Sequence, residues 1–425
     1  MNRIAIIGFG GAGYSAALAA HRQDPEATID VYSDTNTAPY NPMLTTYYVK
    51  GSIPYDALFP FGSVEKISEE LHLSFHAGTP VTGIKPAEKA LLFADGSSKT
   101  YDNILISTGA SAVMPPLPGT DLPGVFKMRT VDDAVQLKEA LATGKVRSGL
   151  VFGASWSGIK VVEDFVEAGV DCTLMNRSRQ AFSKALFPQT AERVQDDLRK
   201  KGVHLAFGQT LDHIEPSEDG RLTAVTASGE RYTVDMISIT SGVKPNLDFL
   251  KGTDVTLGKG VLVNDHMQSN YPGIYAAGDC CDAYETQSRT QRNIALWLNS
   301  MQQGRVAGCN MAGGDERFGA NLALSLGHYL KYDFFTIGDV SLCRDTDEHY
   351  EYEDGSLYIR GVRDENEIKC LNVIGAAESN GILKGVFIKK IENMDAELDL
   401  PTICSLKESG FPDSFIDFLK GQEAG

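Results

Sequence analysis

The sequence predicts an α/β protein with more than one domain, because one strand, turn and helix unit occurs twice in its 425 residues. In each copy a short apolar run leads into a glycine-rich turn, and the copy closes much later with a strand that ends in glycine. The first copy begins at Arg3 and closes with residues 101–110, and the second begins at Gly149 and closes with residues 234–243. These closing segments align without a gap. Strands that alternate with helices predict mostly parallel sheets with right-handed crossovers.

Composition limits the class of protein. The chain is long enough for two or three cores, since single cores stop growing near ~250–300 residues. No stretch approaches the ~20 apolar residues of a membrane span, so membrane insertion is not expected. The net charge of −17 argues against nucleic acid as a partner. The seven scattered cysteines show no metal-ligand spacing, so we expect no metal site and a reducing cytoplasm.

The first glycine turn predicts a dinucleotide site. Gly8, Gly10 and Gly13 follow the apolar run directly, and a helix follows them. Gly8 suits the tight turn, Gly10 lets the backbone approach a pyrophosphate, and Gly13 lets the helix pack on the strand. Gly11 and Ala12 lie at the start of the helix, whose free N–H groups favour phosphate.

An acidic residue at the end of the next strand normally holds the adenosine ribose of the nucleotide. The strand Thr28–Tyr32 ends there, but Ser33 occupies the expected place and Asp34 follows it. Either side chain could accept the ribose hydroxyl. Asp34 could equally be a solvated loop charge, and the sequence leaves both interpretations open.

Four motifs in order resemble those of the pyridine nucleotide–disulfide oxidoreductase superfamily. They are a proline-rich loop at residues 38–45, the segment from Ser107 through a crossover to Asp132, the run Gly273–Asp279 and the helix at residues 296–304. The resemblance covers residues 1 to about 315. It is greatest to the single-flavin branch, which includes NADH oxidases and the ferredoxin, rubredoxin and nitrite reductase flavoproteins.

The resemblance implies that FAD binds the first unit. It implies that Asp279 accepts a hydrogen bond from the ribityl chain and that Trp297 packs beside the flavin rather than serving only as a core residue. The further residues that it assigns to FAD are Asn41, Pro42, Val81, Thr108, Gly109 and Gly278.

The second glycine turn departs from the family pattern. Gly153 and Gly158 are present, but Ser155 replaces the middle glycine and Lys160 stands where the family has a glutamate. A serine hydroxyl could bind a phosphate, yet it also takes space where the pyrophosphate should pass. The closing strand ends at Gly242. The unit therefore predicts a nicotinamide nucleotide site, or a degenerate unit that binds none.

The residues after the second strand of this unit favour NADPH over NADH. NAD sites usually have an acid at that point, whereas this chain has Asn176 followed by Arg177 and Arg179. Arginine is well suited to a 2′-phosphate. The alternative is that both arginines form a solvated basic turn.

Thiol chemistry at the flavin is not expected. The family members that use it carry cysteine on the first flavin helix, and the aligned stretch Met43–Tyr48 has none. The lysine that many ferredoxin reductases place near the flavin is also missing. We therefore predict from position alone that Lys160 approaches the flavin or the nicotinamide as a catalytic residue.

We expect two Rossmann-like domains, the second inserted in the first, and a C-terminal α+β domain. Residues 1–112 and 244–318 would bind FAD, residues 113–243 would bind NAD(P)H, and residues 319–425 would form the third domain. The resemblance implies that this third domain serves dimerisation, so a homodimer is expected.

Short alternating runs after residue 333 predict an antiparallel sheet in the third domain. Asp354-Gly355 and Asn380-Gly381 are read as turns, and the tail Pro401–Leu419 is read as helical. The expected strands are Phe334–Ile337, His349–Tyr352, Ser356–Ile359 and Lys369–Ile374.

The favoured function is an FAD-dependent NAD(P)H oxidoreductase that passes hydride to flavin N5 and electrons onward to oxygen, a small organic molecule or a carrier protein. One alternative is the flavoprotein subunit of a larger electron-transfer complex with a degraded nicotinamide site. Another is a non-catalytic nucleotide-binding protein that kept FAD as a structural group or a redox sensor.

Overall fold

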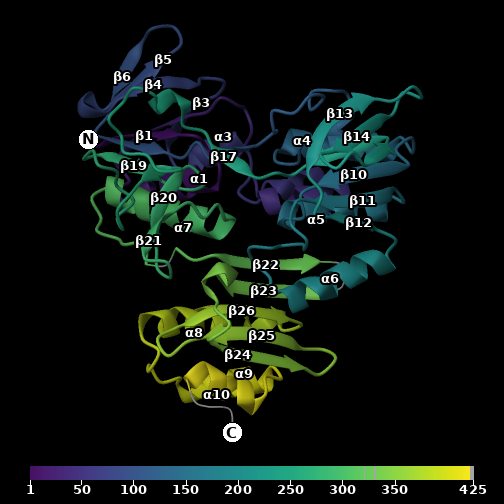
Figure 1. Cartoon of the computed structure of the whole chain (residues 1–425). Helices are drawn as coiled ribbons and strands as arrows, with labels where there is room; N and C mark the ends of the chain where they lie inside the picture. The colour runs from purple at the N-terminus through teal and green to yellow at the C-terminus, as the bar shows by residue number, and fades with distance from the viewer. Residues whose placement is uncertain (320, 330–331, 422–425) are drawn as a thin grey trace. The chain divides into compact units, whose positions relative to one another are not determined.

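The computed structural model describes residues 1–319, 321–329 and 332–421. The chain forms two compact units, and it passes between them several times (Figure 1). Unit 1 contains Met1–Val113, Arg129–Ala134 and Gly242–Asn321. Unit 2 contains Met114–Met128, Val135–Ser241 and Leu322–Gly425.

Unit 1 is built on a parallel sheet in the order β19-β7-β1-β2-β3. Its central strands are apolar on both faces, as strands covered on both sides require. β19 comes from the chain after its long passage through unit 2, so this sheet is assembled from two distant segments. The strands are β1 (Arg3–Ile7), β2 (Thr28–Tyr32), β3 (Leu73–His76), β7 (Asn103–Ile106) and β19 (Ile274–Ala276).

Helices α1 (Gly11–Gln23) and α7 (Trp297–Met311) pack closely in unit 1. A Cβ atom added to Gly304 would lie 2.1 Å from the carbonyl oxygen of Ala12, and one added to Gly308 would lie 2.1 Å from that of Ala16. The two glycines therefore let the helix backbones approach more closely than any side chain would allow. This contact fixes the first half of α1 against the middle of α7.

Smaller elements complete unit 1. An antiparallel sheet contains β4 (Val81–Lys85), β5 (Ala90–Phe93) and β6 (Ser98–Thr100), and a second small sheet contains β18 (Val261–Leu262), β20 (Cys281–Glu285) and β21 (Thr290–Arg292). The outgoing strand β8 (Ala110–Ala112) pairs with the returning strand β17 (Val243–Pro245). The short helices are η1 (Pro42–Leu44), α2 (Thr45–Val49), η2 (Tyr55–Leu58), α3 (Val64–Glu70), η3 (Pro86–Glu88) and η4 (Asp248–Leu250).

Unit 2 contains a second parallel sheet, in the order β12-β11-β10-β16-β9. Helix α5 (Trp156–Glu167) follows β10 directly, as α1 follows β1. The strands are β9 (Val125–Phe126), β10 (Ser148–Phe152), β11 (Asp171–Asn176), β12 (His204–Phe207) and β16 (Met236–Ile239). The remaining elements here are α4 (Val131–Ala142), α6 (Pro188–Lys200), β13 (Leu211–Pro216), β14 (Leu222–Thr226) and β15 (Arg231–Val234).

The C-terminal region belongs to unit 2 as well, although the sequence analysis separates it as a third domain. It contains an antiparallel sheet in the order β22-β23-β26-β25-β24, and α8 packs on β23 and β26 (Figure 1). The strands are β22 (Leu324–Tyr329), β23 (Tyr332–Gly338), β24 (Glu348–Glu353), β25 (Tyr358–Arg363) and β26 (Ile368–Ile374). The helical elements are η5 (Val340–Leu342), η6 (Ala377–Ser379), α8 (Asn380–Glu392), α9 (Leu400–Glu408) and α10 (Asp413–Lys420).

Most of the C-terminal elements agree with the prediction, including the turn at Asp354-Gly355 and the helical tail. The prediction of a turn at Asn380-Gly381 is wrong, because these residues form the first turn of α8. Asparagine and glycine also occur at helix starts, so the dipeptide alone does not specify a hairpin. Strand β22 was not anticipated.

Candidate functional site: two nucleotide-binding turns

The glycine turn of unit 1 has the geometry that a dinucleotide site needs. Gly8 has a φ of 94°, and a Cβ atom there would lie 2.5 Å from the carbonyl oxygen of Ser107. A Cβ atom on Gly13 would lie 2.2 Å from the carbonyl oxygen of Gly8. At Gly10, by contrast, a Cβ atom would meet nothing within 4 Å. Open space at the middle glycine is what the approach of a pyrophosphate requires.

Trp297, which the resemblance assigns to the flavin, lies at this turn, and its contact with a flavin stays a prediction. A Cβ atom added to Gly11 would lie 2.5 Å from Cζ3 of the Trp297 ring, so the indole occupies the space that Gly11 leaves free. Phe61 stacks on the other side of the indole, with 6.4 Å between ring centroids. Gly278 also lies here, since a Cβ atom on it would be 3.1 Å from that of Ala12. Residues from three segments therefore surround the N-terminus of α1.

Asp279 is held from two sides. Nη2 of Arg129 donates a hydrogen bond of 2.5 Å to Oδ2, and the Ser300 hydroxyl donates one of 3.2 Å to Oδ1. Only 13% of the Asp279 side chain is exposed. A carboxylate has about four acceptor positions, so the two hydrogen bonds leave acceptor capacity for a ligand hydroxyl.

Arg129 was missed by the sequence analysis as a site residue. Its Nε donates to the carbonyl of Ala110 at 3.1 Å, which ties Asp279 to the end of the first repeated unit. The backbone at Arg129 is fixed by a capping box, in which Thr130 N–H donates to Asp133 and Asp133 N–H donates to the Thr130 hydroxyl. The pattern Thr-x-x-Asp was a local signal for the helix start, but nothing local indicates the partner 150 residues away.

Ser33 and Asp34, the two candidates for the ribose contact, differ in exposure. Ser33 is buried, and its hydroxyl interacts with Thr35 at 3.3 Å. Asp34 is exposed in the loop that follows β2. Val81, also assigned to FAD by resemblance, begins β4.

The proline-rich loop is ordered by its own side chains. Oδ1 of Asn41 accepts a hydrogen bond from the Met43 N–H, and the Thr45 hydroxyl donates to the carbonyl of Pro42. Burial raises the pKa of Tyr40 in this loop, whereas the charge of Arg129 lowers it. The Arg129 charge thus acts on both the loop and Asp279.

Thr108 and Gly109 close the first unit. The Thr108 hydroxyl donates to the carbonyl of Asn246, and Nδ2 of Asn246 donates back to the carbonyl of Thr108. Gly109 has a φ of 63° and open space at its Cβ position. The two strands that connect the units, β8 and β17, are therefore fastened at this point.

The glycine turn of unit 2 repeats the first in detail. A Cβ atom on Gly153 would lie 2.5 Å from the carbonyl oxygen of Thr240, and one on Gly158 would lie 1.8 Å from that of Gly153. The Thr240 hydroxyl donates to the carbonyl of Gly153, as the Ser107 hydroxyl does to that of Gly8.

Two aspartates continue the correspondence between the units. Asp102 accepts a hydrogen bond from the N–H of Arg3, and Asp235 accepts one from the N–H of Ser148. Each aspartate precedes the closing strand of its unit and ties that strand to the start of the central strand. The repeat predicted from the sequence is thus present as two structures with the same contacts.

Ser155 caps the start of α5 without a hydrogen bond from its side chain to the helix, and it is exposed. Gly242 has open space at its Cβ position, as Gly109 has in unit 1. The serine therefore adds a hydroxyl to the turn without closing it.

Arg177 and Arg179 follow β11 and are exposed. Within the described ranges neither of them forms an ion pair. Asn176 links their turn to the glycine turn, since its Oδ1 accepts from the N–H of Ala154 at 3.3 Å and its Nδ2 donates to the carbonyl of Gln180 at 3.0 Å. Two uncompensated guanidinium groups beside a phosphate-type turn are able to bind a second phosphate.

Lys160 is buried on the second turn of α5. Its Nζ donates to Glu163 at 2.7 Å and to the carbonyl of His328 at 2.5 Å, and it lies 4.4 Å from the ring centroid of Tyr329. These contacts join α5 to β22. The catalytic role that was inferred from its position stays a prediction.

The surroundings of Cys280 and Cys281 in unit 1 do not favour redox chemistry. Burial raises the pKa of the Cys280 thiol to about 11 and that of Cys281 well above its ordinary value. The Cys280 thiol donates to the carbonyl of Ile106, which is typical of a packed thiol. Among the residues that the structure describes, no group of histidine, cysteine, aspartate or glutamate is arranged to hold a metal ion.

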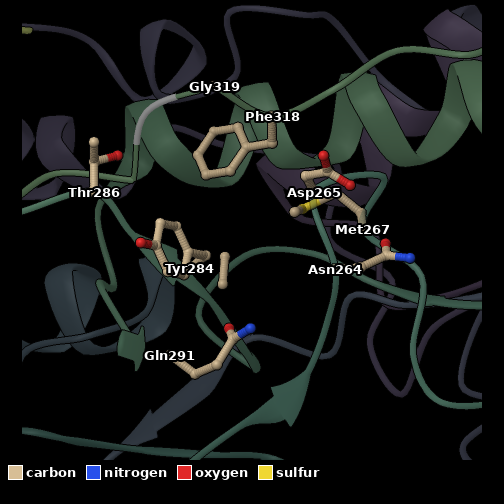
Figure 2. Close-up of a pocket in the computed structure, with 9 residues that line it drawn as sticks. Asn264, Asp265, Met267, Tyr284, Thr286, Gln291, Phe318 and Gly319 are labelled. Carbon is tan, nitrogen blue, oxygen red and sulfur yellow. The ribbon is translucent and has the colours of Figure 1, made fainter. Parts of the chain in front are cut away.

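A separate cavity of about 300 Å³ lies in unit 1 and contains none of the predicted site residues. Figure 2 shows the rings of Phe318 and Tyr284 on two sides of it, with Asp265 nearby. Asp265 is already paired with His266 and Arg317. The cavity is thus lined by polar side chains, among them Asn264, Thr286 and Gln291, as well as by the two rings.

Comparison with known proteins identifies the repeated architecture. The family model described as pyridine nucleotide-disulphide oxidoreductase matches residues 2–304. No helix in the described part of the chain is long and apolar enough to cross a membrane.

Two curated relatives illustrate the range of the matches. An NADH oxidase from Methanocaldococcus jannaschii is 28% identical over 321 residues, which cover 74% of this chain and 71% of the relative. Subunit epsilon of an NADH-dependent phenylglyoxylate dehydrogenase from Aromatoleum evansii is 28% identical over 388 residues, with 90% and 87% covered.

Among solved structures, the water-forming NADH oxidase of Lactobacillus brevis bound to NADH has a TM-score of 0.86 at 20% identity, with 96% of this chain and 99% of that chain covered. An engineered NADPH oxidase made from it, bound to NADPH, has a TM-score of 0.84 at 21% identity, with the same coverage. In that variant an aspartate and the two residues after it are replaced by alanine, arginine and serine.

Proposed function

This chain belongs to the pyridine nucleotide-disulphide oxidoreductase family, and we propose that it is an FAD-dependent oxidoreductase that oxidises NADPH. The observation that carries the proposal is the pair of glycine turns at Gly8 and Gly153, which share the same close contacts. One turn for each nucleotide is what hydride transfer between two dinucleotides needs. FAD, when bound, accepts the hydride at N5 and passes electrons onward.

The residues of unit 1 fit FAD. Open space at Gly10 and the free N–H groups at the start of α1 suit the pyrophosphate. Asp279 retains acceptor capacity for a ribityl hydroxyl, and Trp297 presents its ring at the turn. In this proposal Arg129 orients the Asp279 carboxylate toward that hydroxyl.

NADPH is preferred to NADH in this proposal because of the residues that follow β11. Arg177 and Arg179 are exposed, and an acid is missing at the strand end. Three of the five substitutions in the engineered NADPH oxidase are consecutive, and they introduce alanine, arginine and serine. This chain has Asn176-Arg177-Ser178 at its own strand end, which supports a similar mode of phosphate binding.

The electron acceptor would be reduced without a cysteine at the flavin. The loop and helix from Pro39 to Val49 contain no cysteine. Oxygen, a small organic molecule or an electron-carrier protein are the acceptor classes that this leaves. The predicted homodimer through residues 319–425 is retained as part of the proposal.

A second candidate function is the flavoprotein subunit of a larger electron-transfer complex. Ser155 in place of the middle glycine favours it, because a weakened nicotinamide site is tolerable where a partner supplies the electrons. The match along most of the chain to a dehydrogenase subunit also favours it.

An anaerobic titration of the purified yellow protein separates these two functions. We expect NADPH to bleach the flavin band at much lower concentration than NADH. The Arg177→Ala and Arg179→Ala double variant should lose at least tenfold in apparent NADPH affinity, since hydrogen bonds to charged groups contribute about 1.5–3 kcal/mol each.

The matched control is Arg221→Ala, an arginine of unit 2 that pairs with Asp219 instead. It should leave the preference for NADPH unchanged. Bleaching by dithionite but by neither nucleotide would refute the proposed oxidation of NADPH and favour the subunit.

A further inference from the structure

The C-terminal hairpin β22–β23 of the same unit contacts the first two turns of helix α5. The Tyr329 hydroxyl donates a hydrogen bond of 3.2 Å to the carbonyl of Trp156, the first residue of α5. One turn further along, Lys160 donates to the carbonyl of His328 in β22. The hairpin is therefore attached to both of the first two turns of the helix.

Four aromatic side chains form a cluster at this point, which we call the Trp156 cluster. The Trp156 ring lies 4.2 Å from that of Phe182, 5.0 Å from that of Tyr329 and 6.4 Å from that of Phe334, measured between centroids. Tyr329 also meets the rings of Phe182 and Phe334 edge-on. Phe182, Tyr329 and Phe334 are almost completely buried.

Phe182 connects the Trp156 cluster to the glycine turn of unit 2 and to the arginine turn, which is the loop that carries Arg177 and Arg179. Its φ is 51°, a conformation that bulky residues rarely adopt. Its N–H donates to the carbonyl of Ala154 in the glycine turn at 2.8 Å. Phe182 also follows Arg177 and Arg179 within the same loop, and Asn176 joins that loop to Ala154 a second time. The cluster thus lies where the two turns are fastened together.

We propose that the C-terminal hairpin is part of the nicotinamide nucleotide site and that Tyr329 is a positioning residue for it. Tyr329 fixes the carbonyl and the ring of Trp156, and the Trp156 cluster then holds the glycine turn and the arginine turn at one separation. NADPH would contact both turns at once, the glycine turn through its pyrophosphate and the arginine turn through its 2′-phosphate, so the separation of the turns affects affinity. This inference rests on the proposed binding of NADPH to unit 2.

The position of Tyr329 indicates more than packing. A buried tyrosine needs a hydrogen-bond partner for its hydroxyl, and any nearby carbonyl would satisfy that need. The Tyr329 hydroxyl instead donates to the carbonyl of the first residue of the helix that begins at the glycine turn. This contact does not cover the N-terminal end of α5, because Ser155 and Ser157 stay exposed. The hairpin therefore supports the turn without blocking it.

The test compares two tyrosines of the same sheet. Tyr329→Phe removes the hydrogen bond to Trp156 and keeps the ring. Tyr350→Phe is the matched control, because its hydroxyl bonds Ser414 and its ring packs on Phe415 and Phe418, away from α5. Affinity is measured with NADP⁺ by calorimetry on the FAD-loaded protein, so that no electron transfer is involved.

We expect Tyr329→Phe to weaken NADP⁺ binding threefold to fivefold and Tyr350→Phe to leave it unchanged. Fivefold corresponds to about 1 kcal/mol, the contribution of one neutral hydrogen bond. Equal affinity of Tyr329→Phe and the parent protein would overturn the inference. Equal weakening by both variants would also overturn it, since the effect would then come from the sheet as a whole.

A second readout follows the tryptophan directly. The chain has two tryptophans, Trp156 and Trp297, so labelling with 5-fluorotryptophan gives two ¹⁹F resonances. Tyr329→Phe should shift the resonance of Trp156 alone, and an unshifted resonance would contradict the role of Tyr329. If Tyr329→Phe does not fold, Phe334→Leu is the second variant. It removes the aromatic ring that β23 contributes to the Trp156 cluster, and it should also weaken NADP⁺ binding.

The inference and the proposed function fail in different ways. A parent protein that binds no NADP⁺ refutes the proposed function and the inference with it. A parent protein that binds NADP⁺, with Tyr329→Phe unaffected, refutes the inference alone.

Discussion

The guanidinium of Arg129 donates a hydrogen bond of 2.5 Å to the carboxylate of Asp279. The two residues lie 150 positions apart, and Asp279 belongs to the late motif that we propose binds FAD. Only 29% of the arginine side chain is exposed, and its Nε is engaged by Ala110. Because both side chains are largely buried, water competes only partly with their hydrogen bond. The pair therefore holds the carboxylate in one orientation.

Arg129→Met is expected to weaken FAD retention tenfold or more, because hydrogen bonds to charged groups contribute about 1.5–3 kcal/mol. The recovery of flavin fluorescence on dilution measures the dissociation of FAD. The control is Arg305→Met, which breaks a more exposed ion pair between Arg305 of α7 and Glu316. A variant at Arg129 that retains FAD as well as this control would contradict the account.

Gly158→Ala should destabilise unit 2 and abolish NADP⁺ binding while leaving FAD bound. The added methyl group would lie 1.8 Å from the carbonyl of Gly153, and overpacking of this kind costs about 1–3 kcal/mol. Gly385→Ala in α8 is the control, since nothing lies within 4 Å of its Cβ position. That change should stabilise the helix by about 0.5–1 kcal/mol. Urea denaturation of both variants provides the comparison, and equal stability of the two would be inconsistent with the tight turn.

Lys160 has both a structural and a predicted catalytic role, and a mutant cycle separates them. Lys160→Met leaves the buried Glu163 without its lysine, so we expect a loss of about 3–5 kcal/mol in unfolding free energy. The double variant with Glu163→Gln should recover most of that loss. The catalytic role predicts slower flavin reduction in both variants. A double variant with full stability and an unaltered rate of reduction would leave Lys160 a structural role only.

Asp30 should make the stability of unit 1 depend on pH. Burial raises the pKa of Asp30, but hydrogen bonds from His76, Lys99 and Tyr101 outweigh burial and leave the pKa below its ordinary value. A carboxyl group with a lowered folded pKa stabilises the fold above its unfolded pKa of about 3.9. That contribution is lost as the pH falls through the folded pKa.

Asp30→Asn is therefore expected to lower the unfolding free energy at pH 7 and to lose its effect well below pH 4. The reason is that the parent carboxyl is itself protonated there. Urea denaturation at both pH values measures the difference. Asp121→Asn, in an exposed position, is the control and should change little at either pH. A difference between Asp30→Asn and the parent that persists at low pH would argue against the charge of Asp30.

The glycine turns were predictable because their cause is local. The turn itself requires a positive φ at Gly8 and Gly153, and Gly13 and Gly158 lie against the carbonyls of those glycines only five residues earlier. The closing strands were predictable for the same reason, since Asp102 and Asp235 occupy equivalent places in two similar segments. Comparing the two repeated segments of the chain with each other was enough to predict these elements.

The residues that support those turns were not predictable, because they belong to segments that are distant in the sequence. The approach of Arg129 to Asp279 depends on the return of the chain to unit 1, and the contact of Tyr329 with Trp156 depends on how β22 packs on α5. Strand β22 itself has a mixed pattern that gives little signal. Asn380-Gly381 was misjudged because both residues tolerate a turn as well as a helix start, and the packing of α8 on β23 and β26 decides between them.

The central claim is that NADPH delivers hydride to a flavin bound by this chain. Anaerobic stopped-flow mixing of the yellow protein with NADPH and with NADPH deuterated at C4 tests it most directly. We predict that NADPH bleaches the flavin band and that deuterium slows the bleaching, because the transferred C–H bond breaks in that step. Absence of bleaching, in a protein that dithionite still reduces, would contradict the claim.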